Sequence, residues 1–341
     1  MLTVHLGVDI AKESFEAARW RGDTGQRLGQ FPNTAAGFAQ FAKVVQQATE
    51  GSEEKQFHLV LEPTGGYELG LALWARQSGW QVSRPNPKHV REFTRGLGQR
   101  AKTDRQDALM LARYGAERNP PRWAPLACEV SELESLLERQ RELEQMLGQE
   151  RRRQQALSGR PGVAAHVPTT IQTLIDTLEA TLKQLQEEIQ AHLKRHPHLK
   201  TAAKRLLKVP GVGARNVLWL LVLLVRWETL TEGAGSAKSL VAYVGLDPST
   251  YESGTSVRGR RSISRQGDRR LRSLLYMSAL GAIKGKNGLQ QFYLRLVGRG
   301  KAKKAALVAA SRKILVWAWA VYRDQTDFRP PACQAEPATS A

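Results

Sequence analysis

The sequence predicts an α/β domain followed by two helical segments, as expected where alternating elements give way to helices alone. Three observations support this prediction. Short apolar segments alternate with amphipathic ones over the first 125 residues, apolar positions recur at three- and four-residue steps from Val130 to Ile189, and a glycine-rich turn separates two helical stretches after residue 201. We therefore expect an α/β domain over residues 1–125, a coiled-coil linker over 126–200, a mostly helical domain over 201–326 and a disordered tail over 327–341.

The first domain is expected to begin with three short strands, Thr3–Val8, Ser14–Trp20 and Gly29–Pro32. A helix follows, and Asn33 is its expected N-cap because a side-chain oxygen there can accept from a free backbone N–H. The later elements alternate between strand and helix: Phe57–Leu61, Tyr67–Gln77, Gln81–Arg84 and Asp104–Glu117. Asn119-Pro120-Pro121 ends the last helix. This order is typical of a ribonuclease-H-like topology.

Two long amphipathic helices are expected in the linker, before and after a break at Gly159–Pro168. Their apolar positions form a narrow stripe among many Glu, Gln and Arg residues, which is the pattern of a coiled-coil seam. The two helices could close on each other as a hairpin or pair with another subunit. The narrow stripe favours pairing between subunits, and so a homo-oligomer, from dimer to tetramer.

A glycine-rich turn, Val209 to Gly213, lies between the helical stretches Lys204–Lys208 and Ala214–Val225. Helix, glycine turn and helix in this order predict a helix-hairpin-helix. There Gly211 and Gly213 would let backbone N–H groups approach a phosphate without an intervening side chain. A plain corner between two helices is the alternative.

The charge is concentrated near the C-terminus. The chain has 51 Lys and Arg against 32 Asp and Glu, a net charge of +19, and Ser253–Lys313 alone contains 16 basic residues and one acidic residue. A polyanion is the natural partner of such a field, because each neutralised phosphate releases a counterion. Aromatic residues among the charges favour nucleic acid over a merely solubilising surface. The basic residues expected to contact phosphates are Arg258, Arg260, Arg261, Arg269 and Arg270.

Several classes of protein are excluded by composition. The longest unbroken apolar run is Val217–Val225, well short of the ~20 residues of a membrane span, and no basic leader or cleavage site precedes the first strand. Two cysteines cannot form a disulfide framework or a cysteine-rich zinc site. We expect a soluble cytoplasmic protein that associates with the nucleoid and with no membrane.

Four carboxylates form the candidate catalytic set. Asp9 and Glu62 each end an apolar strand, so in a parallel sheet they would emerge at neighbouring carboxyl ends. Asp104 and Asp107 are three residues apart on one helix, which places them on one face. Hard oxygen ligands suit Mg²⁺ or Mn²⁺, and two such ions can support in-line displacement at phosphorus. Singly, each residue could be a cap, a turn or a surface residue; as a set in a basic protein they favour a metal site.

These carboxylates lie in recognisable blocks. The first half contains Gly7-Val8-Asp9-Ile10-Ala11-Lys12, Leu61-Glu62-Pro63-Thr64-Gly65-Gly66-Tyr67 and Lys102-Thr103-Asp104-Arg105-Gln106-Asp107-Ala108. The second half contains Val209-Pro210-Gly211-Val212-Gly213, Ala242-Tyr243-Val244-Gly245-Leu246, Tyr251-Glu252-Ser253-Gly254 and Ser256-Val257-Arg258-Gly259. In this order, from about Val4 to Tyr322, the chain resembles the DEDD transposases of insertion-sequence family one-ten and the related Piv-type DNA invertases.

The resemblance implies an N-terminal RuvC-like nuclease domain, a coiled-coil linker and a C-terminal transposase domain. It implies site-specific recombination, in which a structured bridge RNA pairs with both target and donor DNA. It also implies assembly as a tetramer, in which each active site combines residues of different subunits. The DEDD residues map onto Asp9, Glu62, Asp104 and Asp107. The family's nucleophilic serine maps onto Ser253, which would form a phosphoserine intermediate and conserve the energy of the cleaved bond without ATP.

Three alternatives differ from this reading. A RuvC-like junction nuclease would hydrolyse DNA with metals and water, without a serine ester. A non-catalytic RNA- or DNA-binding protein would use the carboxylates structurally. An actin-like ATPase also opens with a strand and a glycine-x-aspartate, but the matching phosphate loops are absent from the sequence.

Overall fold

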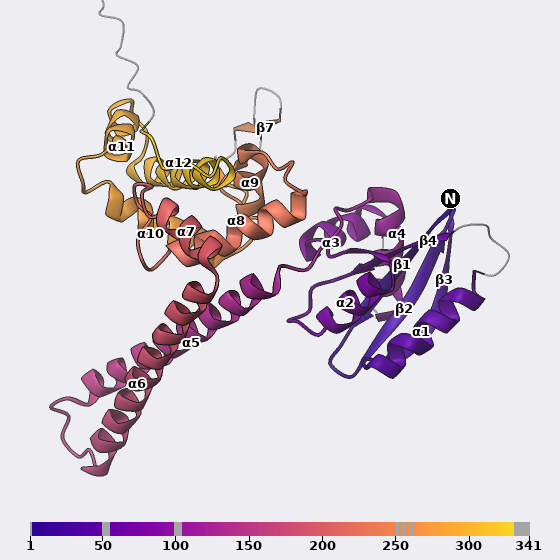
Figure 1. Cartoon of the computed structure of the whole chain (residues 1–341), viewed down its shortest axis with the longest axis horizontal. Helices are drawn as coiled ribbons and strands as arrows, with labels where there is room; N and C mark the ends of the chain where they lie inside the picture. Colours follow the sequence, from indigo (N-terminus) through magenta and orange to yellow (C-terminus); the bar gives the residue numbers. More distant parts are fainter. Residues whose placement is uncertain are drawn as a thin grey trace, which may run out of the picture. The chain divides into compact units, whose positions relative to one another are not determined.

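The protein forms two compact units, one made up almost wholly of residues 1–125 and one of residues 126–228 and 232 onward (Figure 1). The computed structural model describes residues 2–49, 55–98, 104–249, 252–253, 257–258 and 262–330. Arg260, Arg261 and all but the first four residues of the expected tail lie outside the described residues. The first unit is mixed α/β and the second is mainly helical, which confirms the predicted fold class at this level.

A five-stranded sheet is the centre of the first unit, in the order β3-β2-β1-β4-β5. Strands β1 to β3 form an antiparallel meander, and β4 and β5 run parallel to β1. The strands are β1 Leu2–Ile10, β2 Ser14–Arg21, β3 Thr24–Pro32, β4 Lys55–Leu61 and β5 Gln81–Ser83. The helices of this unit are α1 Ala35–Gln47, α2 Leu69–Gln77, α3 Pro87–Gly96 and α4 Asp104–Arg118.

Helices cover both faces of this sheet. Apolar residues of α1 and α2 pack with one face around Phe41, Leu59 and Leu71, all fully buried. On the other face Leu111 of α4 packs against Val60 of β4. Alternating residues of one strand point to opposite faces, so each central strand buries both of its sides.

The predicted order of strands and helices is confirmed, with two differences. Helix α3 was not predicted, because its only buried side chains, Val90 and Phe93, are too few to produce a long periodic pattern. The N-cap of α1 is Thr34, whose side chain accepts from the Gly37 N–H, so the prediction of Asn33 is wrong by one residue. Asn33 instead bridges two loops, as described below.

Two helices, α5 Cys128–Leu157 and α6 His166–Arg195, form the linker. They pack along each other within the chain as a hairpin (Figure 1), through Leu143, Leu147, Ile175, Leu178 and Leu182. The predicted apolar seam is therefore satisfied inside one chain, and the intrachain alternative is the one observed. Pairing between subunits, which the narrow stripe favoured, is not needed to bury it.

The rest of the second unit is a helical domain with a small β-arm. Its helices are α7 Pro197–Leu206, α8 Val217–Thr231, α9 Ala237–Val244, α10 Arg269–Ala282, α11 Gly288–Gly298 and α12 Lys303–Arg323. The arm pairs β6 Pro248–Ser249 with β9 Ser262–Ile263, and β7 Glu252–Ser253 with β8 Val257–Arg258.

Helix α12 is the core helix of this domain. Within the described residues it is the one helix long and apolar enough to cross a membrane, but half of its most apolar window is buried inside the unit. Ile314, Leu315 and Trp319 are almost completely buried, and α12 packs against α7, α9, α10 and α11. Its apolar character is explained by this packing.

Candidate active site and nucleic-acid interface

Asp9 and Glu62 lie side by side at the carboxyl ends of two parallel strands. The register pairs Val8 of β1 with Leu61 of β4, so the next residue of each strand is a carboxylate. Asp9 shares a face of the sheet with Gly7, and Glu62 is the first residue after β4. The sequence prediction that these two residues are neighbours is thus consistent with the fold.

Helix α4, which carries the other two carboxylates in its first turn, packs on the face of the sheet that contains Gly7 and Val60. A Cβ on Gly7 would lie 2.0 Å from the Ala108 carbonyl oxygen and 2.2 Å from the Ala112 nitrogen, so the backbones of α4 and β1 touch there. At the far end of the helix, Gly115 packs against Val60 and faces His5. The helix therefore runs antiparallel to β1, and its first turn, with Asp104 and Asp107, extends toward the end of the strand that bears Asp9.

The donor set fits a hard divalent cation. All four residues offer carboxylate oxygens and no imidazole or thiol, which is the ligand type of Mg²⁺ and Mn²⁺. Among the described residues no three of these carboxylates have ligand atoms within 4.8 Å of one another. The direction of α4 points its first turn toward the end of the sheet where Asp9 and Glu62 lie, and binding of one cation by all four carboxylates stays a prediction.

A buried carboxylate that the sequence analysis missed shapes the loop after Glu62. Glu68 is 1% exposed, accepts from the backbone N–H groups of Thr64 (3.1 Å) and Gly66 (3.0 Å), and pairs with Arg84. Burial alone would raise the pKa of the Glu68 carboxyl, but backbone hydrogen bonds and Arg84 together hold this pKa below its usual value. The loop that begins at Glu62 is thus ordered around a buried anion.

Asn33 joins this loop to the one that follows Asp9. Its Nδ2 donates to the carbonyl oxygens of Ala11 and Tyr67, each at 3.1 Å. The first carbonyl lies two residues after Asp9 and the second lies in the loop after Glu62. Asn33 therefore links the two loops that follow these carboxylates, a contact that no local sequence pattern indicates.

A further carboxylate, Glu16, lies directly across β1–β2 from Asp9. It is 7% exposed, and both of its oxygens bind the guanidinium of Arg27. The negative charge of Glu16 is thereby balanced by Arg27 of the neighbouring strand β3.

Ser253 lies on the β-arm of the second unit, in β7, and its backbone pairs with Val257 of β8. The base of the arm is clamped by two glycines in the left-handed region. A Cβ on Gly245 would lie 2.0 Å from the Gln266 carbonyl oxygen, and one on Gly267 would lie 2.1 Å from the Tyr243 carbonyl oxygen. Arg272, whose pKa is lowered by burial, donates to the carbonyls of Val244, Gln266 and Gly267.

The glycine turn between α7 and α8 packs into the domain. Gly211 has φ +91°, and a Cβ there would lie 2.7 Å from Ile314 and 3.2 Å from Ala282, so packing as well as backbone conformation requires glycine. Gly213 has open space around it, and its N–H already donates to Asn216 Oδ1 at 2.7 Å. Contact of either glycine with a phosphate stays a prediction.

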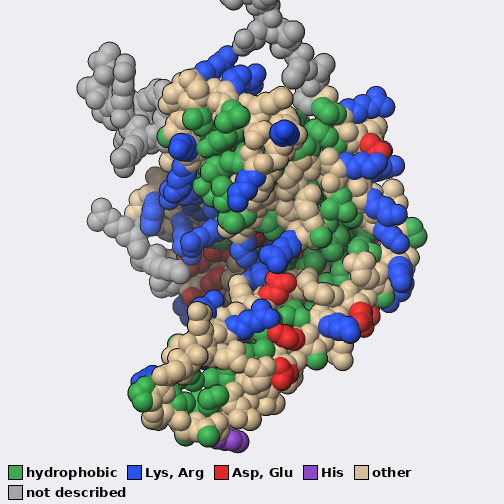
Figure 2. Space-filling view, turned by 90° about the vertical axis from the view of Figure 1, so that its left-hand side faces the viewer, with side chains coloured by type: hydrophobic (Ala, Val, Ile, Leu, Met, Phe, Trp, Pro, Cys, Tyr) green, Lys and Arg blue, Asp and Glu red, His purple; other side chains and the backbone are tan. Residues whose placement is uncertain are grey.

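The predicted arginine contacts differ in their surroundings. Arg269 is exposed in the first turn of α10, whereas Arg270 lies 3.6 Å from both Glu138 and Asp268. Arg258 is in β8. Lys and Arg side chains are spread over the helical part of this unit in the face that Figure 2 shows. The second unit therefore presents many positively charged side chains, although Arg270 and Arg272 also make contacts within the fold.

Comparison with known proteins defines the class. A family model described as "Transposase IS116/IS110/IS902 family" matches residues 203–294, and a model of DEDD transposases of IS110, described as "Transposase", matches residues 6–158. The chain belongs to this IS110 family of transposases and recombinases, enzymes that rearrange DNA.

Individual relatives cover different shares of the chain. It is similar to the pilin gene-inverting proteins of Moraxella lacunata and Moraxella bovis, each 34% identical over 96% of this chain and 98% of the relative. An uncharacterized 43.6 kDa protein of insertion element IS110 from Streptomyces coelicolor is 34% identical over 37% of this chain and 31% of the relative.

Proposed function

We propose that this chain is a site-specific DNA recombinase of a mobile or invertible element, which cuts and rejoins strands through a phosphoserine intermediate. Asp9, Glu62, Asp104 and Asp107 would hold Mg²⁺ or Mn²⁺, which supplies charge stabilisation at the phosphorus that is attacked. The observation that carries the proposal is the contact of α4 with β1 at Gly7, because it directs the first turn of α4 toward the ends of β1 and β4.

The chain's own residues divide the work between its two units. The carboxylates of the RuvC-like first unit position the scissile phosphate. The hydroxyl of Ser253 attacks phosphorus, forming a serine–phosphate ester as the bond to the leaving deoxyribose oxygen breaks. Because the ester conserves the energy of the cleaved bond, the oxygen of another strand can displace the serine and reseal the DNA. Carboxylates and serine of different subunits of a tetramer would complete each active site.

The remaining part of the proposal concerns guidance and DNA binding. A structured bridge RNA would pair with target and donor DNA, and the basic stretch Ser253–Lys313 would bind the phosphates of both nucleic acids. Sequencing the RNA that copurifies with the protein from its native element tests this step. Recovery of one structured RNA from the element is the expected result, and recovery of only bulk cellular RNA would contradict it.

A specific experiment tests the chemistry. With Mg²⁺, the RNA and a plasmid that carries the sites, Asp107→Asn should lower cleavage about a hundredfold or more while DNA binding persists. Ser253→Ala should abolish the covalent protein–DNA adduct on denaturing gels, and the matched control Ser256→Ala should retain it. Cleavage by wild-type protein without any adduct would favour a hydrolytic junction nuclease, and intact plasmid in every case would favour a non-catalytic binding protein.

DNA inversion is the second candidate reaction. The pilin gene-inverting proteins match this chain over 98% of their own length, whereas the IS110 protein is matched over 31% of its length. Two recombination sites in inverted orientation on one plasmid should yield the inverted segment if inversion is the reaction. Excised or inserted elements would instead indicate transposition.

A further inference from the structure

A second group of metal-ligand side chains lies at the base of the helical hairpin, within the second unit. Glu132 comes from the second turn of α5, His192 from the last turn of α6, and His196 from the residue that ends α6 and precedes α7. One ligand atom from each of these residues lies within 4.8 Å of the other two. Among the described residues, it is the one group of three His, Cys, Asp or Glu side chains whose ligand atoms lie this close together.

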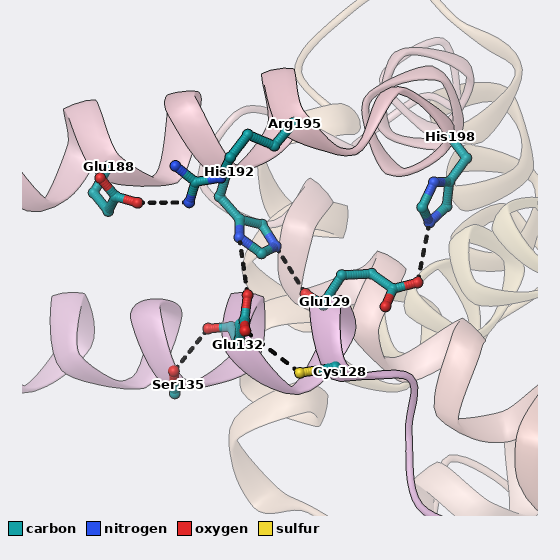
Figure 3. A network of polar contacts seen from close by, with 8 residues as sticks. All are labelled: Cys128, Glu129, Glu132, Ser135, Glu188, His192, Arg195 and His198. Atoms are coloured by element: carbon teal, nitrogen blue, oxygen red, sulfur yellow. Dashed lines mark hydrogen bonds and ion pairs between the residues drawn. The ribbon is translucent and has the colours of Figure 1, made fainter.

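The hydrogen bonds of His192 leave one ring nitrogen facing the cluster. His192 is 1% exposed, and its Nε2 lies 2.8 Å from the backbone carbonyl oxygen of Glu129. A carbonyl oxygen only accepts, so Nε2 carries a proton, and Nδ1 is the ring nitrogen that a metal ion could bind. Nδ1 lies 3.6 Å from Glu132 Oε2 and points toward it (Figure 3), so this nitrogen and a carboxylate oxygen face each other.

This arrangement matches the surroundings of histidines that bind metals. A ligating histidine commonly donates its other N–H to a carbonyl or carboxylate, which fixes the tautomer and orients the ring. Atoms bound to one zinc ion at about 2.1 Å lie about 3.4 Å apart in a tetrahedron, close to the 3.6 Å between Nδ1 and Oε2. The rings of His192 and His196 are 4.6 Å apart between centroids, and one nitrogen of each ring lies within 4.8 Å of the other and of a Glu132 oxygen.

The chemistry of the ligands selects the kind of metal. Two imidazoles and one carboxylate suit zinc and similar transition-metal ions, whereas Mg²⁺ and Ca²⁺ prefer oxygen alone. Glu132 is 56% exposed, so the fourth position of such an ion is open to water. Cys128 lies beside the group and donates its S–H to the other oxygen of Glu132 at 3.4 Å, which orients the carboxylate (Figure 3).

We propose that Glu132, His192 and His196 form a zinc site that joins the start of α5 to the junction of α6 and α7. The ion would tie the base of the hairpin to the helical domain. It is separate from the carboxylate set of the first unit in ligand chemistry and in position along the chain. The proposal does not depend on the recombination mechanism.

The test is a titration of the full-length chain without an affinity tag, after treatment with a chelator. Zn²⁺ should bind with one tight equivalent per chain and raise the unfolding temperature, because a ligand of the folded state stabilises it. Co²⁺ in place of zinc should produce the visible absorption of a tetrahedral site. Glu132→Gln and His196→Gln should each weaken binding about tenfold or more and remove this absorption.

Two matched controls come from the adjacent pair His198 and Glu129, whose side chains lie 3.5 Å apart. His198→Gln and Glu129→Gln should bind zinc like the wild type. Circular dichroism of each metal-free variant establishes that it is folded, which separates loss of a ligand from loss of structure. The proposal is overturned if no equivalent binds tightly, if the ligand variants bind like the wild type, or if the controls lose as much affinity as His196→Gln.

Discussion

A buried histidine in contact with a half-buried one should make the first unit sensitive to mild acid. His58 is 0% exposed; Arg122 Nη1 lies 3.0 Å from its Nε2, and His5 Nδ1 lies 3.0 Å from its Nδ1. Because a guanidinium is a cation that only donates, its approach to Nε2 disfavours a second positive charge on the buried His58 ring. Burial first, then the charges of Arg122 and His5, lower the pKa of His58 from 6.5 to about 3.

The size and sign of the effect follow from that pKa. Between about pH 6.5 and pH 3 the unfolded chain binds a proton that the folded chain does not, so stability falls as the pH falls. At pH 5 this difference amounts to about 2 kcal/mol relative to pH 7, or about a 30-fold increase in the unfolded fraction. Burial and Arg122 also lower the pKa of His5, which acts in the same direction.

Hydrogen exchange of the β4 amides measures this change within the first unit. After correction for the intrinsic exchange rate, opening of β4 should rise about 30-fold from pH 7 to pH 5 in the wild type. His58→Gln should flatten this dependence, whatever its effect at pH 7. His89→Gln, which alters an exposed histidine of the same unit, should leave it unchanged. Equal pH dependence in the wild type and His58→Gln would refute the reasoning.

Three further predictions concern the carboxylate set and the basic surface. Gly7→Ala forces a Cβ into the backbone of α4. It should destabilise the first unit by about 1–3 kcal/mol in thermal unfolding and abolish recombination. The control Gly96→Ala, where a Cβ meets open space, should do neither. Glu68→Gln breaks a buried ion pair and should cost about 3 kcal/mol in urea unfolding, with recombination impaired although every DEDD residue remains; unchanged stability would contradict the buried pair. Arg269→Gln should make the plot of log DNA affinity against log salt concentration less steep by about one unit, without changing the melting temperature. Arg272→Gln should instead lower the melting temperature, because it removes three hydrogen bonds to backbone carbonyls.

Much of the first unit could be predicted from the sequence because its signals are local. Apolar alternation marks the strands, and Pro120 and Pro121 follow the end of α4 after one residue, Asn119. The positions of Asp9 and Glu62 at strand ends followed from the same pattern. A helix as short as α3 leaves too few buried residues for periodicity to detect, which is why it was missed.

Contacts between distant segments were decided only by the tertiary structure. The apolar stripes of α5 and α6 indicate that each helix must be covered, but an identical stripe serves an intrachain hairpin or another subunit, and only packing shows that the two helices cover each other. The need for glycine at position 7 depends on a helix about a hundred residues further along the chain. The same holds for Glu132, which faces His192 across two helices and has no neighbouring residue that marks it as a ligand. Periodicity reports which side of an element is buried, whereas the partner on that side depends on chain topology, which local propensity does not encode.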